Sequence, residues 1–279
     1  MSPIHDQGYR RYGGGRARGR AWLVIVNAGV RTMLRDRKFV ALLAASWIQF
    51  LVRSVQFYFA ANFSQAAIIA PNAETFRDFF DKQDIFVFIV TVTLGAALIA
   101  QDRRVNALQI YLSKPLTRAE YIFGKLGILM VFLLFITWLP AMLLLVVQVV
   151  FAGNFAFVQA NAYLFPAITL YALLEVVMVS TSMLALSSLS TNSRFVGILY
   201  TGLIFFSQAV AGVLRFITAS TSFSWVAFGN NLSQVGDVIF RVPLRYTTPW
   251  PVSLLVILAL IGISGVILER RVRGVEIVA

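Results

Sequence analysis

Long apolar runs alternate with short polar connections along most of the chain. Six of these runs are long enough for a helix to cross about 30 Å of hydrocarbon. They cover residues 39–61, 84–101, 125–151, 162–189, 195–218 and 250–268. The pattern predicts an all-α membrane protein, a bundle of six transmembrane helices within residues 39–268. Pro140 lies inside the third run and predicts a kink, because proline removes a backbone donor and clashes with the preceding turn.

The segments that flank the first and last runs have a different pattern. Residues 21–38 show a helical period with Trp22, Val26 and Val30 on one face and arginines on another, which predicts an amphipathic helix in the membrane interface. The alternative is a cytoplasmic extension of the first span. Residues 1–20 are rich in arginine and glycine and predict a disordered basic tail attracted to anionic membrane lipids. An RNA-binding tail is the other interpretation, although we expect no nucleic-acid partner.

Two connections on the opposite side of the predicted bundle are longer than a turn requires. Residues 62–83 carry both acidic and basic side chains and predict a short charged helix that leads into the second span. Residues 219–249 mix aromatic residues with Asn230, Gln234 and Asp237. They are too polar to span a membrane and too apolar for an ordinary loop, so we expect amphipathic or re-entrant half-helices at the outer surface.

Lysine and arginine are concentrated on one side of the predicted bundle. Of the 24 basic residues, all but six lie in segments that alternating spans place together: residues 1–38, the connection after the second run, the end of the fourth run and the chain end. The other six are Arg53, Arg77, Lys82, Arg215, Arg241 and Arg245. Because short basic loops stay in the cytoplasm, the pattern predicts that both termini, including the short tail 269–279, are cytoplasmic.

Composition restricts the possible chemistry. Hydrophobic residues make up 59% of the chain and charged residues 13%, so much of the surface must face lipid. Cysteine is absent and His5 is the only histidine, which leaves few ligands for a metal and few groups for a hydrolase mechanism. We therefore expect no enzyme activity in this chain. A membrane-embedded enzyme and a non-transporting scaffold remain alternatives to a transport protein.

Glu175 lies near the middle of the fourth run, where a charged side chain costs about 2.5–3.5 kcal/mol. One interpretation is a residue on a substrate path or one linked to proton movement. The other is a buried carboxyl that fixes helix packing through hydrogen bonds. Arg53 and Arg215 are candidate partners, although both also suit side chains that reach the outer headgroups.

The connection from Gln101 to Lys125 is the most informative segment. Leucines at helical spacing are followed by Pro115, and then Thr117 and Glu120 fit a capping box that begins the next helix. This order predicts a helix, a proline elbow and a second helix over residues 102–124. Such a rigid element can transmit motion.

This elbow resembles the intracellular segment of ATP-binding cassette (ABC) type-2 permeases, which are commonly exporter subunits. The resemblance is carried by Leu112, Ser113, Pro115, Leu116, Thr117, Arg118, Glu120, Tyr121, Gly124 and Lys125, with Asp102 and Leu108 before them. Asn106 and Ala107 depart from the glycine and threonine that are usual in the family. The order of an amphipathic helix, six spans and outer half-helices is similar as well.

The resemblance implies a permease that binds no cofactor itself and couples to a separate cytoplasmic ATPase, which would bind ATP and magnesium. Gly124 and Lys125 do not form a phosphate-binding loop, because Leu126 stands where serine or threonine is required. A second permease subunit, identical or related, and a prokaryotic-type plasma (inner) membrane are also implied. The residues that the resemblance assigns to ATPase coupling are Asp102, Arg103, Arg104, Leu108, Leu112, Ser113, Lys114, Pro115, Leu116, Thr117, Arg118 and Glu120.

Overall fold

The computed structural model describes residues 21–63, 69–107 and 117–272, and this part of the chain is helical without a strand. Six helical segments are long and apolar enough to cross a membrane, as the sequence predicts. They are Arg37–Asn62, Ala73–Arg104, Arg118–Ala152, Leu164–Leu189, Ser193–Thr218 and Trp250–Arg271. The chain is therefore a multi-pass membrane protein with an all-α fold.

Several spans consist of more than one helix. The first contains α2 (Arg37–Ser46) and α3 (Ile48–Asn62), and the second contains α4 (Ala73–Val90), the π-helix η2 (Thr91–Gly95) and α5 (Ala96–Arg104). The third contains α7 (Arg118–Ile136) and α8 (Trp138–Ala152). The last three spans are α10 (Leu164–Leu189), α11 (Ser193–Thr218) and α13 (Trp250–Arg271). Outside the spans lie α1 (Ala21–Met33), α9 (Ala156–Ala160), the 3-10 helix η3 (Ser224–Val226) and α12 (Phe228–Ile239).

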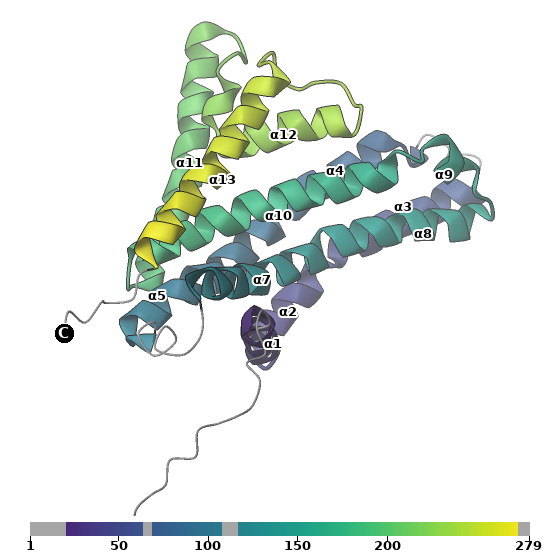
Figure 1. The fold of residues 1–279 in the computed structure, drawn as a ribbon. Coiled ribbons are helices and arrows are strands. Elements are labelled where there is room, and N and C mark those ends of the chain that lie inside the picture. The colour runs from purple at the N-terminus through teal and green to yellow at the C-terminus, as the bar shows by residue number, and fades with distance from the viewer. Residues whose placement is uncertain (1–20, 64–68, 108–116, 273–279) are drawn as a thin grey trace, which may run out of the picture.

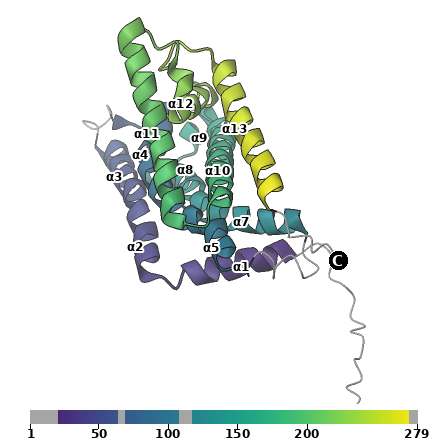
Figure 2. The same ribbon diagram turned by 90° about the vertical axis from the view of Figure 1, so that its left-hand side faces the viewer.

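Helix α10 is the centre of the bundle and packs against α5, α7, α8, α11 and α13. The helix α12 lies at one end of the bundle and contacts α13, α11, α10 and α4 (Figure 1). At the opposite end α1 crosses below the upright helices and packs on α7 (Figure 2). The start of α2 and the end of α13 lie at this second end, which we call the basic end because Arg37, Arg118, Arg194 and Arg271 lie there.

Close approach of α1 to α7 depends on glycines. A Cβ atom added at Gly29 would lie 2.2 Å from Cδ1 of Ile128, and one added at Gly124 would lie 2.8 Å from Cβ of Ile25. Side chains at these positions would therefore push the two helices apart. Helix α1 is thus joined to the protein along one face, while its place in a membrane interface stays a prediction.

Two of the predicted runs lie inside longer helical segments. The segment with the second run begins at Ala73 and the segment with the third at Arg118, ahead of residues 84 and 125. The charged helix expected within residues 62–83 is continuous with the second run, and it begins with a capping box of Asn72 and Thr75. A hydropathy scale counts Arg77 as a polar residue, so the predicted second run begins only after these charges. In the structure, Arg77 is fully buried and its charge is balanced by neighbouring acids.

The kink predicted at Pro140 is present, and the third span is interrupted at Thr137. Proline at position 140 has no N–H for the carbonyl of Ile136, four residues earlier. Nε2 of Gln83 donates to that oxygen at 2.7 Å, and also to the carbonyl of Ser46 at 3.1 Å, where the first span is interrupted. The buried side chain of Gln83 therefore satisfies the backbone at two kinks in two neighbouring spans.

We expect Gln83→Leu to lower the free energy of unfolding by about 1–3 kcal/mol for each carbonyl that it leaves without a donor. Adding Pro140→Ala supplies an N–H for the Ile136 carbonyl, so part of the loss should return in the double variant. Chemical unfolding of the purified protein in detergent measures both effects. Equal losses in the single and double variants would show that Gln83 does not act through this carbonyl.

Candidate functional site

The described ends of the predicted coupling elbow are joined to each other. Nζ of Lys125 on α7 lies 2.7 Å from Oδ2 of Asp102 on α5, and the Tyr121 hydroxyl donates to the same oxygen at 2.7 Å. Lys125 also lies over the Tyr121 ring, 5.6 Å from its centroid. We call these three residues the Asp102 clamp. The clamp fixes the distance between α5, where the elbow begins, and α7, where it ends.

The clamp is attached to the centre of the bundle through α10. Oγ of Ser187 accepts from the backbone N–H of Ile99 and of Ala100 and donates to the carbonyl of Ala96. The guanidinium of Arg103 donates to the carbonyl of Ser188. The end of α5 therefore cannot shift without breaking contacts to the end of α10.

The predicted capping box is confirmed at the start of α7. Oγ1 of Thr117 accepts from the N–H of Glu120 at 3.2 Å, and Oε2 of Glu120 accepts from the N–H of Thr117 at 2.9 Å. Arg104 and Arg118 are exposed at the two sides of the elbow. The remaining predicted coupling residues lie outside the described residues: Leu108, Leu112, Ser113, Lys114, Pro115 and Leu116.

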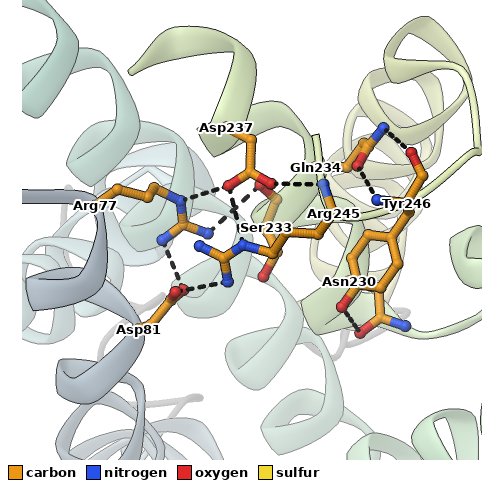
Figure 3. A network of polar contacts seen from close by, with 8 residues as sticks. All are labelled: Arg77, Asp81, Asn230, Ser233, Gln234, Asp237, Arg245 and Tyr246. Atoms are coloured by element: carbon orange, nitrogen blue, oxygen red, sulfur yellow. Dashed lines mark hydrogen bonds and ion pairs between the residues drawn. The ribbon is translucent and has the colours of Figure 1, made fainter. Parts of the chain in front are cut away.

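A second polar site lies at the other end of the bundle, where α4 meets α12 (Figure 3). Arg77 places Nη1 2.7 Å from Oδ1 of Asp81 and Nε 3.2 Å from Oδ1 of Asp237. Arg245 contacts the same two carboxylates at 2.6 Å and 3.2 Å. We call these four residues the outer quartet, because the sequence predicts that this end of the bundle faces outward. It contains two positive and two negative groups, and the Arg77 and Asp237 side chains are completely buried.

Close packing surrounds the outer quartet. The guanidinium of Arg77 lies 4.8 Å from the centroid of the Tyr171 ring, and Tyr171 packs edge-on against Phe80. At Gly236 on α12, an added Cβ atom would lie 2.7 Å from Nε of Arg77. Glycine at this position therefore allows α12 to approach the arginine directly.

Polar side chains hold the rest of α12 in place. Nε2 of Gln234 donates to the carbonyls of Tyr246 and Thr248, and the Tyr246 hydroxyl donates to Asn230 (Figure 3). Burial raises the pKa of Asp237, while Arg245 and Arg77 oppose that effect, and burial likewise raises the pKa of Tyr246. Asp237 thus depends on both arginines to keep its charge, and Tyr246 stays a neutral donor.

Sequence reasoning missed the outer quartet. Arg77 and Asp237 are 160 residues apart, and no local pattern links them. One signal was present, because Asp237 is the only acidic residue within 219–249, and an acidic side chain in a largely apolar segment needs a cation beside it. The spacing of Arg77 and Asp81 on one helix face was a second signal.

The partners predicted for Glu175 were wrong. Arg53 donates to Gln56 at 2.7 Å and lies 3.7 Å from Asp78, and Arg215 is exposed at the end of α11. The titratable group beside Glu175 is instead Asp84, a residue of α4. Asp84 is the first residue of the predicted second run. In the structure the helix begins at Ala73, so Asp84 lies well inside it.

A groove of about 650 Å³ lies between α11 and the segment formed by η2 and α5. Its lining includes Gly197, Thr201 and Gly202. An added Cβ atom at Gly197 would lie 3.3 Å from Val92, whereas one at Gly202 would meet nothing within 4 Å. The small residues of α11 therefore border open space as well as a neighbouring helix.

Comparison of the chain with models of known protein families finds no family that matches. Comparison with curated proteins finds no significant match either.

Proposed function

We propose that this chain is the permease subunit of an ATP-driven ABC transporter, an exporter of the type-2 class. The observation that carries the proposal is the Asp102 clamp, in which Lys125 and Tyr121 hold Asp102 at 2.7 Å. It joins both ends of an elbow whose sequence resembles that family's coupling segment. A docked ATPase that moved the elbow would move α5 and α7 together, and through Ser187 the end of α10.

The distribution of charge supports a cytoplasmic position for the basic end. Basic residues mark the starts of α2, α7 and α11 and the ends of α5 and α13 at this end of the bundle. By the positive-inside rule, the clamp and the elbow then face the cytoplasm, where an ATPase is available. Helix α1 would lie in the interface on the same side, in a prokaryotic-type plasma membrane.

The opposite end suits the outer half-helices of such a permease. Asn231, Gln234 and Asp237 on α12 are fully buried in protein. Polar groups are tolerated near membrane depth when protein covers them. Helix α12 therefore has the properties of a half-helix that caps the bundle on the outside.

A second permease subunit would pack along α11. Ile198, Phe206 and Phe216 are 70%, 70% and 89% exposed on this helix. Ile198 lines the groove together with Gly202. Small residues beside large apolar ones allow transmembrane helices to pack closely. Two copies or two related chains would complete the transporter, and the ATPase partners would bind ATP and magnesium.

We expect an ATPase of the ABC class to copurify with this protein from its native membranes and to hydrolyse ATP in the complex. Arg118→Glu should weaken this association, because Arg118 is exposed beside the elbow. Arg270→Glu is the matched control, since it reverses an exposed charge at the same end of the bundle. ATP turnover and subunit stoichiometry of the purified complexes are the measurements.

Two results would contradict this function. One is a purified protein without any ATP-hydrolysing subunit. The other is a complex whose ATP turnover and composition do not change with Arg118→Glu.

A further inference from the structure

Two carboxyl groups meet inside the membrane-spanning part of the bundle. Asp84 on α4 and Glu175 on α10 lie within hydrogen-bonding reach of each other. Each lies one turn beyond a residue of a packed pair that joins the same two helices, Phe80 and Tyr171, whose ring centroids are 4.8 Å apart. A carboxylate only accepts hydrogen bonds, so a bond between two carboxyl groups requires a proton on one of them. Two carboxyl groups at this separation therefore favour one proton held between them.

The burial of Glu175 supports this conclusion independently. Glu175 is 1% exposed, and its Oε2 atom is buried without an ordinary hydrogen-bond donor in the described residues. A buried acceptor without a donor costs about 1–3 kcal/mol, and more when it is charged. A proton brought to the carboxyl pair removes this cost.

The neighbouring charges do not compensate the pair. The titratable groups around it are Arg77 and Asp81 from α4, Tyr171 from α10, Tyr200 from α11, Asp237 from α12 and Arg245 from the connection to α13. The two arginines are already matched by Asp81 and Asp237 in the outer quartet. Ionised Asp84 and Glu175 would add two negative charges without a cation among these groups.

We propose that Asp84 and Glu175 form a proton-binding site that takes up one exchangeable proton between their carboxyl groups. The proton comes from water: an O–H bond forms on one carboxyl, and its hydrogen bond reaches the other. Asp84 is the more accessible of the two, because it is exposed on the surface of the chain while Glu175 is 1% exposed. We therefore assign proton entry to Asp84. The site does not depend on the transporter assignment.

The bound proton adds to the contact between α4 and α10, where Phe80 and Arg77 also pack on Tyr171. With the proton in place, the two helices share a hydrogen bond. Without it, two like charges face each other, which separates the helices. The π-helix Thr91–Gly95 begins about two turns beyond Asp84, and such segments accommodate shifts within a long helix. Gly95 packs there against Met183 of α10, so a shift of α4 reaches the centre of the bundle.

Infrared difference spectra of the full-length protein in detergent test the proposal. Spectra taken across a pH titration should show one protonated carboxyl band that shifts on exchange into D₂O. Glu175→Gln and Asp84→Asn should each remove the same band, because the two groups share one proton. Glu74→Gln, which changes an exposed acid in the first turn of α4, should leave the band unchanged.

The proposal is overturned if the wild-type protein lacks this band or if the two variants remove two separate bands. It is also overturned if the band disappears when choline is replaced by sodium at constant ionic strength. The carboxyl pair would then bind a metal cation rather than a proton. Circular dichroism of each variant verifies folding, and both substitutions keep the side-chain size. None of these measurements requires an ATPase, so this result and the test of the transporter function can fail separately.

Discussion

Arg77→Met is expected to lower the free energy of unfolding by about 3–5 kcal/mol. Arg77 is completely buried and contacts the carboxylates of Asp81 and Asp237. Methionine keeps much of the volume but leaves Asp237 buried with only Arg245 to balance two acids. Unfolding of the purified protein in detergent, followed by circular dichroism, measures the loss.

Two further variants separate charge from packing. Asp237→Asn combined with Arg77→Met removes one unbalanced acid, so the double variant should be more stable than the sum of the single losses predicts. Arg241→Met is the matched control, because Arg241 is exposed and lies 4.4 Å from the Tyr163 ring centroid, a contact worth about 0.5–1 kcal/mol. If Arg77→Met is no more harmful than Arg241→Met, the outer quartet does not hold α12 on α4.

In the proposed transporter, Asp102→Asn is expected to reduce the coupling between ATP turnover and transport by about 5- to 150-fold. The substitution removes the charge that Lys125 contacts at 2.7 Å, and the side chain of Lys125 is 11% exposed. Loss of this charge-assisted contact should also cost about 1.5–3 kcal/mol of stability. The measurement compares ATP turnover with substrate movement in proteoliposomes that contain the complete complex.

The effect on coupling must be distinguished from a loss of folding. Tyr121→Phe removes one donor to Asp102 but keeps the ion pair, so its effect on coupling should be the smaller of the two. Asp36→Asn is the control, because Asp36 caps α2 at the same end of the bundle and lies outside the clamp. Unchanged coupling in Asp102→Asn, with the complex intact, would exclude a role for the clamp in transmission.

Local sequence signals predicted the elements well where the physical cause was local. Pro140 indicated the kink in the third span, and Thr117 with Glu120 indicated the start of α7. The kink and the helix start both depend on backbone groups within four residues of the side chain that causes them, so the local sequence is enough to predict them. The side chain that completes the kink, Gln83, lies 53 residues away and was not predicted.

The elbow was predicted partly by resemblance, and its function stays a prediction. The sequence placed Asp102 and Lys125 at its two ends, and the structure brings them into contact. Nothing in the spacing indicated that they form an ion pair, because this contact depends on how α5 and α7 converge. The same reason explains why Glu175 was paired with arginines instead of Asp84.

By itself the sequence determined a six-span helical membrane protein with one strongly basic end, because hydrophobic length and charge count are sums over neighbouring residues. Only the tertiary structure decided which buried charges neutralise one another. A charge inside a membrane is tolerated only beside a partner, and that partner can come from any helix that packing brings near. Arg77 pairs with Asp237 from α12 in the outer quartet. Glu175 lies beside another acid, Asp84 from α4, and the proposed proton takes the place of a counter-charge there.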